Sequence, residues 1–197
     1  MLLLTSAGIV TILFLIWIVL IYMRKSLWDV VHRNLIDLED HYKGKIIRNG
    51  FAARPVFHGK INEHDLTINF STARSKEGRK TYIDFTLTIS SPLSITIAER
   101  DWLKEQDSEN PNMDSVLFIN DDLAYVLLPA NNRKVEKIIV KDEFRRVLKK
   151  FDNLAYFFVG RSGTICEFWT DKLDKDTEFK VMNERLNQIR MMLGVLE

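Results

Sequence analysis

Residues 2–23 form an unbroken run without a charged side chain, and Arg24 and Lys25 follow the run at once. At about 1.5 Å of rise per residue, a helix of this length crosses a hydrocarbon core about 30 Å thick. Such a helix is apolar on every side and has no polar face for water, which disfavours a place at the surface of a soluble domain. No Lys or Arg precedes the run, and no A-x-A-like site follows it, which argues against a cleaved secretory signal. The sequence therefore predicts an uncleaved signal-anchor over residues 1–23 of a single-pass membrane protein, which contacts the lipid bilayer through residues 2–23.

Basic residues lie on the C-terminal side of this run, and they predict its orientation. Arg24, Lys25 and Arg33 follow the run, with Lys43 and Lys45 further on, whereas the N-terminal side has only the α-amino group. Because Lys and Arg are enriched on the cytoplasmic side of a span, we expect the C-terminal domain to lie in the cytoplasm.

The remainder of the chain is long enough for one domain. About 170 residues follow the run, which suffices for a single substantial core. The formal net charge is +1, so no nucleic acid is expected as a partner. Cys166 is the single cysteine, so the chain has no intramolecular disulfide, and its strand-like surroundings favour a buried structural role. We expect an anchor over 1–23, an amphipathic juxtamembrane helix over 24–44 and a soluble domain over 45–197.

The juxtamembrane segment carries one apolar stripe at helical spacing, and Gly44 is a natural stop for the helix. The stripe comprises Trp28, Val31, Leu35, Leu38 and Tyr42. Two interpretations follow. The stripe packs on the protein's own sheet, or it pairs with a second copy as a short parallel coiled coil and forms a homodimer.

The middle of the chain alternates apolar and polar residues with a period of two, which is typical of antiparallel strands. Residues 54–61 predict a weak edge or bulged strand, because Pro55 and Gly59 lie within it. Clear alternation continues over 66–71, 83–89 and 93–97, and predicts an antiparallel meander with a polar face rich in Thr and Ser.

The C-terminal part adds strands and helices. Strand-like runs cover 115–119 and 123–128, and a hairpin is expected over 154–159 and 163–170 around Gly160 and Gly163. One helix lies within 133–150, with Val140, Phe144, Val147, Leu148 and Phe151 on one face. A last helix spans about 175–193, with Asp174 or Asp176 as its N-cap and Gly194 as its end. Segregated strands and helices predict an α+β fold.

Charge is distributed unevenly along the sequence. Residues 99–122 contain eight acidic and two basic residues, whereas residues 133–150 contain eight basic and three acidic residues. A second basic segment, residues 74–80, lies between two predicted strands. A solvated surface is one interpretation, and contact with anionic lipid headgroups or an acidic protein is the other. The candidate contact residues are Arg74, Lys76, Arg79, Lys80, Arg145, Arg146, Lys149 and Lys150.

No residue pattern predicts a catalytic, cofactor-binding or metal site. The four histidines form no HExxH motif, and the chain has no CxxC motif. His58 and His64 flank one predicted turn and are interpreted as solvated. Ser162 lies in Gly160-Arg161-Ser162-Gly163, which is a turn sequence and lacks the strand-to-helix setting of a nucleophile elbow.

These features together favour a non-catalytic interaction or scaffold module at the membrane surface. The alternatives are a membrane-tethered enzyme with an unrecognised site and a small accessory subunit of a membrane complex. A deep pocket with converging polar groups would favour the enzyme, and a flat charged or apolar patch would favour the scaffold.

Overall fold

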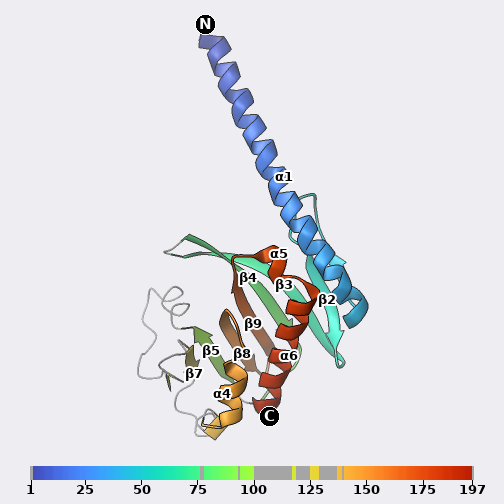
Figure 1. The fold of residues 1–197 in the computed structure, drawn as a ribbon, viewed down its shortest axis with the longest axis vertical. Helices are drawn as coiled ribbons and strands as arrows, with labels where there is room; N and C mark the ends of the chain where they lie inside the picture. The colour runs from blue at the N-terminus through green and yellow to red at the C-terminus, as the bar shows by residue number, and fades with distance from the viewer. Residues whose placement is uncertain are drawn as a thin grey trace.

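The computed structural model describes residues 2–75, 78–92, 94–99, 117–118, 125–128, 137–138 and 140–196. Lys76 and most of the acidic segment 99–122 lie outside these residues, as does the first part of the helix predicted within 133–150. The described part forms an α+β fold in which one long helix leads into a nine-stranded sheet with further helices on it (Figure 1).

The first helix, α1, runs from Leu2 to Tyr42 without a break. Its N-terminal half projects away from the rest of the molecule (Figure 1). Most of the large apolar side chains between Ile9 and Met23 are exposed, with fractions of 50% to 66%. This helix is long and apolar enough to cross a membrane, as the sequence predicts.

The C-terminal half of α1 is part of the domain core. Trp28 is 5% exposed, and Val31, Leu35 and Leu38 are fully buried. Tyr42 packs against the same core, and its hydroxyl donates a hydrogen bond to Asn183 Oδ1. These contacts confirm the interpretation that the stripe packs on the protein's own sheet. A homodimer through the same side chains would require them to leave this core.

The end of α1 is more specific than the sequence indicates. Lys43 adopts the left-handed conformation with φ of 47°, and the Gly44 amide donates to Glu39 O at 3.0 Å, which together form a Schellman motif. Gly44 is needed for a different reason. A Cβ atom there would lie 2.4 Å from the Phe57 ring and 2.7 Å from His58 O. Gly44 therefore allows the strand that carries Phe57 and His58 to pass close to the end of α1.

All strand pairs in the sheet are antiparallel. In sheet order the strands are β1 (Lys45–Ile47), β2 (Val56–Ile61), β3 (His64–Ser75), β4 (Gly78–Leu87), β9 (Gly163–Thr170), β8 (Leu154–Gly160), β5 (Ile95–Glu99), β7 (Tyr125–Leu128) and β6 (Leu117–Phe118). The three-residue β1 forms one edge, where the Ile46 amide donates to Glu39 Oε1 at 2.6 Å. The Glu39 side chain on α1 thereby satisfies the Ile46 amide, which faces away from β2 and would otherwise be open to another strand.

The predicted meander is correct for three strands and wrong for the fourth. Strands β2, β3 and β4 pair in chain order, but the segment 93–97, which contributes to β5, does not continue the meander. Strands β9 and β8 lie between β4 and β5. The expectation of an edge or bulged strand over 54–61 is also corrected, because β2 pairs with both β1 and β3.

The predicted hairpin over 154–170 is confirmed, and it occupies the centre of the sheet. Gly160 pairs with Gly163 across a two-residue turn that contains the exposed Ser162. Cys166 is fully buried on β9, and burial raises the pKa of its thiol well above the usual value. These observations agree with a structural role for this cysteine.

Within the described part of the chain, three further helices follow or connect these strands, and their limits differ from the predicted ones. They are α4 (Asp142–Leu148), α5 (Leu173–Asp176) and α6 (Phe179–Leu196). Val140 is 70% exposed and precedes α4, so it does not belong to the buried face that Phe144, Val147 and Leu148 form. Gly194 lies inside α6 and does not end it.

The predicted capping of the last helix is also wrong. Asp176 ends the separate helix α5, and its side chain accepts a hydrogen bond from the Thr170 hydroxyl. Its other carboxylate oxygen lies 3.7 Å from the buried guanidinium of Arg185. These partners hold α5 and α6 against β9, because Arg185 also lies 4.9 Å from the centre of the Phe168 ring.

Candidate functional site at the exit of α1

The candidate contact residues fall into two groups that the fold separates. Arg74, Arg79 and Lys80 lie at the free ends of β3 and β4, where Arg74 and Arg79 are direct cross-strand partners, and we call them the hairpin patch. Arg145, Arg146, Lys149 and Lys150 lie on or directly after α4, all exposed, and form the α4 patch. In Figure 1 the ends of β3 and β4 that carry the hairpin patch lie at the upper left of the domain, to one side of the point where α1 leaves it, and α4 lies at the lower end.

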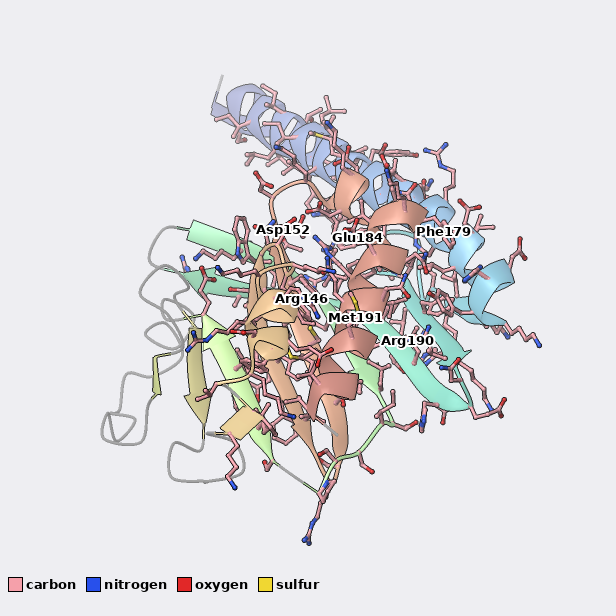
Figure 2. The ribbon with its side chains drawn as sticks, turned by 60° about the horizontal axis from the view of Figure 1, so that its bottom comes forward. Arg146, Asp152, Phe179, Glu184, Arg190 and Met191 are labelled. Carbon is pink, nitrogen blue, oxygen red and sulfur yellow. The ribbon has the colours of Figure 1, made fainter. Side chains whose placement is uncertain are left out.

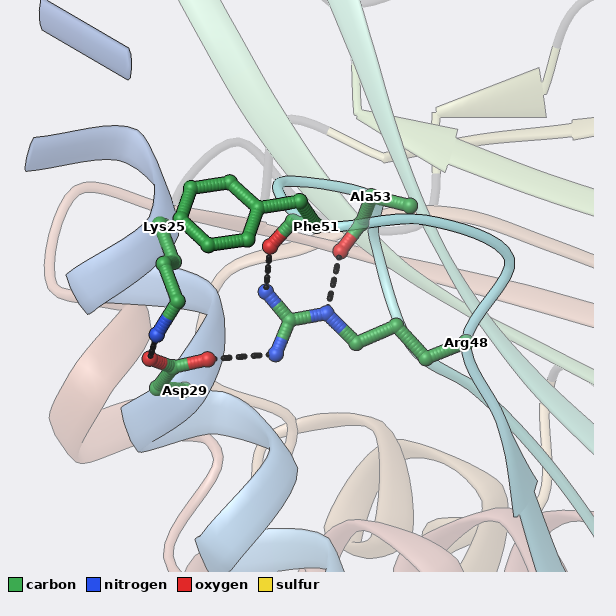
Figure 3. Close-up of polar contacts among 5 residues, drawn as sticks. All are labelled: Lys25, Asp29, Arg48, Phe51 and Ala53. Atoms are coloured by element: carbon green, nitrogen blue, oxygen red, sulfur yellow. Dashed lines mark hydrogen bonds and ion pairs between the residues drawn. The ribbon is translucent and has the colours of Figure 1, made fainter. Parts of the chain in front are cut away.

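A network of polar contacts connects the loop after β1 to α1 at its exit (Figure 3). The Arg48 guanidinium donates from Nε to Ala53 O at 3.0 Å and from Nη2 to Phe51 O at 2.9 Å. Its Nη1 donates to Asp29 Oδ1, and Lys25 Nζ donates to Asp29 Oδ2, each at 2.5 Å. The two cations hold the pKa of the Asp29 carboxyl below its usual value. Arg48 thus fixes the shape of the loop and, through Asp29, its position on α1.

This network presents one large apolar side chain to the outside. Phe51 is 57% exposed, and its ring makes an edge contact with the Tyr22 ring, with 5.8 Å between the ring centres and an interplanar angle of 86°. Lys25 Nζ lies 5.2 Å from the centre of the Phe51 ring. Tyr22 is itself 60% exposed and lies at the end of the charge-free run. An exposed aromatic pair and a cation therefore lie together at the level where α1 leaves the domain.

Arg54 connects this loop to the hairpin patch. Its Nη1 donates to Phe70 O at 2.6 Å, its Nη2 donates to Thr72 Oγ1 at 2.7 Å, and its guanidinium lies 5.7 Å from the Trp28 ring centre. Burial lowers the pKa of Arg54, and the charges of Arg24 and Arg79 lower it further. Arg54 therefore connects the loop, the Trp28 side of α1 and β3, the strand that leads to the hairpin patch.

These residues define the exit cluster. It comprises Arg24, Lys25, Asp29, Arg48, Phe51, Arg54 and Arg79, and Tyr22 lies beside it. Five cations and one carboxylate make this surface positive. Tyrosine side chains such as that of Tyr22, with an apolar ring and a polar hydroxyl, settle at membrane interfaces, and basic residues are attracted to anionic headgroups. The arrangement therefore suits contact with the polar surface of a bilayer.

The α4 patch lies beside a groove on the other side of the domain. The groove has a volume of about 610 Å³, and its cations Lys149, Lys150 and Lys180 lie near Asp152 and Glu184. Figure 2 shows α6 beside α4, with Glu184, Arg190 and Met191 labelled along the helix. A second groove of about 530 Å³ lies on the far side of α6 and shares Asn183 and Asn187 with the first. Both are open and mixed in charge, unlike a deep catalytic pocket.

A pair of carboxylates lies on the face of the sheet that carries alternate polar residues. Asp84 on β4 is the direct cross-strand partner of Glu167 on β9. Burial and, to a lesser degree, the charge of Asp84 together raise the pKa of Glu167 to about 7. Burial also raises the pKa of Asp84, although Ser71 Oγ donates a hydrogen bond to it at 3.1 Å. Within the described residues, no group of three or more His, Cys, Asp or Glu side chains is placed to bind a metal ion.

Sequence reasoning missed four residues of the exit cluster, which are Asp29 on α1 and the loop residues Arg48, Phe51 and Arg54. Arg48, Phe51 and Arg54 lie in a segment that shows no periodicity and no motif. The one signal in the sequence was a large apolar residue, Phe51, directly after Gly50 in a segment without helix or strand periodicity. The histidine interpretation is supported in part, because His58 is exposed and its Nδ1 lies 3.2 Å from Thr67 Oγ1.

The fold and these surfaces define an α+β protein with one helix that is long and apolar enough to cross a membrane. No protein-family model matches the sequence, and no curated protein matches it. Among solved structures, the chain is similar to the crystal structure of the mycobacterial trehalose monomycolate transport factor A, TtfA, with 9% sequence identity and a TM-score of 0.47. The match covers 83% of this chain and 96% of that chain. A likeness at this level gives no information on function.

Proposed function

We propose that the protein is a single-pass, membrane-anchored interaction module whose domain is held with the exit cluster against the membrane surface. Residues 2–23 cross the bilayer, and the domain lies on the cytoplasmic side, as the basic residues after the run favour. The observation that carries the proposal is the continuity of α1, whose exposed apolar half leads directly into a half that is buried in the domain core.

The hairpin patch and the exit cluster support contact with anionic lipid headgroups. They lie at the end of the domain from which α1 emerges, where a cytoplasmic leaflet would face them (Figure 1). Each basic residue near such a leaflet gains about 1 kcal/mol. The α4 patch lies at the opposite end and suits an acidic protein partner better than the lipids around α1.

We expect the full chain to stay in the membrane pellet after extraction at alkaline pH, because an inserted helix is not held by charge. Replacing two apolar residues of the run with charged ones, in Leu13→Arg with Ile16→Arg, should release the chain, since each charge at the bilayer centre costs about 2.5–3.5 kcal/mol.

A pair of C-terminal reporters, one active only in the cytoplasm and one only outside it, measures on which side of the membrane the domain lies. Release of the parent chain at alkaline pH, or an external C-terminus, would contradict the proposal.

Hydrogen exchange provides a test of the headgroup contact. With the full chain in lipid nanodiscs, amides at the free ends of β3 and β4 should exchange more slowly in anionic phosphatidylglycerol than in neutral phosphatidylcholine. The difference should shrink in high salt, because ions screen the attraction. The double variant Arg74→Glu with Arg79→Glu should abolish it.

The matched control reverses two charges at the other end of the domain. Arg145→Glu with Arg146→Glu changes the net charge by the same amount on exposed side chains of α4. This control should leave the lipid-dependent protection of the β3–β4 ends unchanged. Equal exchange in the two lipids for the parent chain, or equal loss in both double variants, would remove the support for a headgroup contact at the hairpin patch.

A further inference from the structure

We infer that Phe51 is a second membrane contact, which enters the headgroup region beside Tyr22 and fixes the rotation of the domain about the axis of α1. The inference rests on the proposed function, because it requires that residues 2–23 cross the bilayer. It assigns a role to a loop that contributes no strand or helix and whose most prominent side chain points away from the core.

Exposure and position are the first part of the argument. Phe51 is 57% exposed although it contacts Tyr22, and Val19, which lies one turn before Tyr22 on the same side of α1, is 56% exposed. The loop therefore extends the apolar surface of the span sideways instead of burying Phe51 under the sheet. Tyr22 is of the type that is enriched at this level of a membrane, and the wholly apolar ring of Phe51 beside it gains free energy when its exposed area is buried at the boundary of headgroups and acyl chains.

The loop is held in shape, which is the second part of the argument. Arg48 binds two carbonyl oxygens of the loop, those of Phe51 and Ala53, and ties them to Asp29 on α1 (Figure 3). Gly50 adopts φ of 128°, a conformation that residues with a Cβ rarely adopt, and the Ala53 amide donates to Gly50 O at 3.4 Å. The loop is thus already ordered around Phe51, so a contact through this ring would cost little further loss of conformational freedom.

The charges around the loop identify the kind of surface that it contacts. Lys25 lies beside the Phe51 ring, and Arg24 and Arg54 lie on the same side of the domain. A basic residue next to an exposed aromatic ring places its cation among phosphate groups while its stem stays in apolar surroundings. This combination, continuous with the span, fits a bilayer interface better than a second copy of the chain, whose matching surface would carry the same positive charge.

The test measures the depth of three spin labels in the full chain reconstituted in liposomes. Cys166 is fully buried, so the parent chain should take up no label, and single cysteines are introduced as Leu13→Cys, Phe51→Cys and Val140→Cys. Leu13 lies in the charge-free run. Val140 is 70% exposed next to α4 and serves as the matched exposed apolar control. The ratio of oxygen to water-soluble nickel accessibility reports depth.

We expect a several-fold higher ratio at residue 51 than at residue 140, and the highest ratio at residue 13. A label at residue 51 as accessible to nickel as the label at residue 140 would overturn the inference while the signal from residue 13 still supports the span. A water-like signal at residue 13 would instead overturn the proposed function. A label at residue 51 that is shielded from both reagents, and released when the protein is diluted in lipid, would identify a second copy and also overturn the inference.

A second variant separates the loop from the ring itself. Arg48→Lys keeps the positive charge. The three N–H donors of its ammonium group share one nitrogen, so they cannot reach both loop carbonyls and Asp29 as the wide, flat guanidinium group does. In this background the label at residue 51 should lose most of its depth signal, and the label at residue 13 should keep its own. An unchanged depth at residue 51 would show that Arg48 does not position the loop.

Discussion

A chain that begins at residue 45 is expected to be unfolded, whereas a chain that begins at residue 24 is expected to fold. Deletion of residues 24–44 removes Trp28, Val31, Leu35 and Leu38, which are 0% to 5% exposed in the core. Burial of a large apolar side chain contributes about 1.5–3 kcal/mol, so the four together contribute on the order of 6–12 kcal/mol. This equals the whole stability of an ordinary domain, which is about 5–15 kcal/mol.

Circular dichroism and urea unfolding of the two chains in buffer measure this difference. The 24–197 chain should unfold in one cooperative transition, and the 45–197 chain should show none. The single substitution Leu35→Ala in the longer chain should lower the free energy of unfolding by about 2–5 kcal/mol, whereas the exposed control Ile36→Ala should change it little. A cooperative transition in the 45–197 chain would contradict the view that α1 belongs to the core.

The second large effect concerns pH and the Asp84–Glu167 pair. The pKa of Glu167 is about 7 in the folded chain, above its ordinary value of 4.5. Since the folded chain keeps this proton to higher pH than the unfolded chain, Glu167 contributes full stability below about pH 4.5 and loses it as pH rises through about 7. After discounting for its partial exposure, the loss is on the order of 1–2 kcal/mol.

The substitution Glu167→Gln should remove this loss. At pH 8 the variant should be more stable than the parent by about 1–2 kcal/mol, because two like charges no longer lie opposite each other on adjacent strands. At pH 4 the two chains should be nearly equal. Urea unfolding at both values measures the difference, from which the carboxyl groups outside the Asp84–Glu167 pair cancel because the two chains share them. A parent that gains stability relative to the variant as pH rises would contradict the assignment.

Local patterns carried the sequence-based predictions that are correct. The spacing of Trp28, Val31, Leu35 and Leu38 predicted a buried helix stripe, and the alternation over 66–71 and 83–89 predicted β3 and β4. The turn residues Gly160 and Gly163 predicted the β8–β9 hairpin. Each of these features is determined by neighbours a few residues apart, which a periodicity or a turn preference reports directly.

The features that were wrong or missed depend on distant parts of the chain. The place of β5 beside β8 reflects the insertion of a later hairpin into the sheet, which no local pattern encodes. Asp84 and Glu167 become partners only because β9 pairs with β4. Arg48 acts through loop carbonyls and Asp29, 19 positions earlier in the chain. Gly194 lies inside α6, which runs on to Leu196, so a glycine after the apolar stripe did not mark the end of this helix.

The unbroken path of α1 from the charge-free run into the core has a mechanical consequence. A flexible linker would give the domain a reach that grows with the linker's length, but α1 has no linker between Met23 and Trp28. The 41 residues of α1 form one lever about 60 Å long, anchored at one end in the sheet. With residues 2–23 in the bilayer, as we propose, a tilt or rotation of that half of α1 would be transmitted to the domain as a whole. A partner would then meet the domain at a fixed height above the membrane and in one orientation relative to it. Such a partner would reach the domain either by diffusing within the membrane or by binding from solution at the membrane surface.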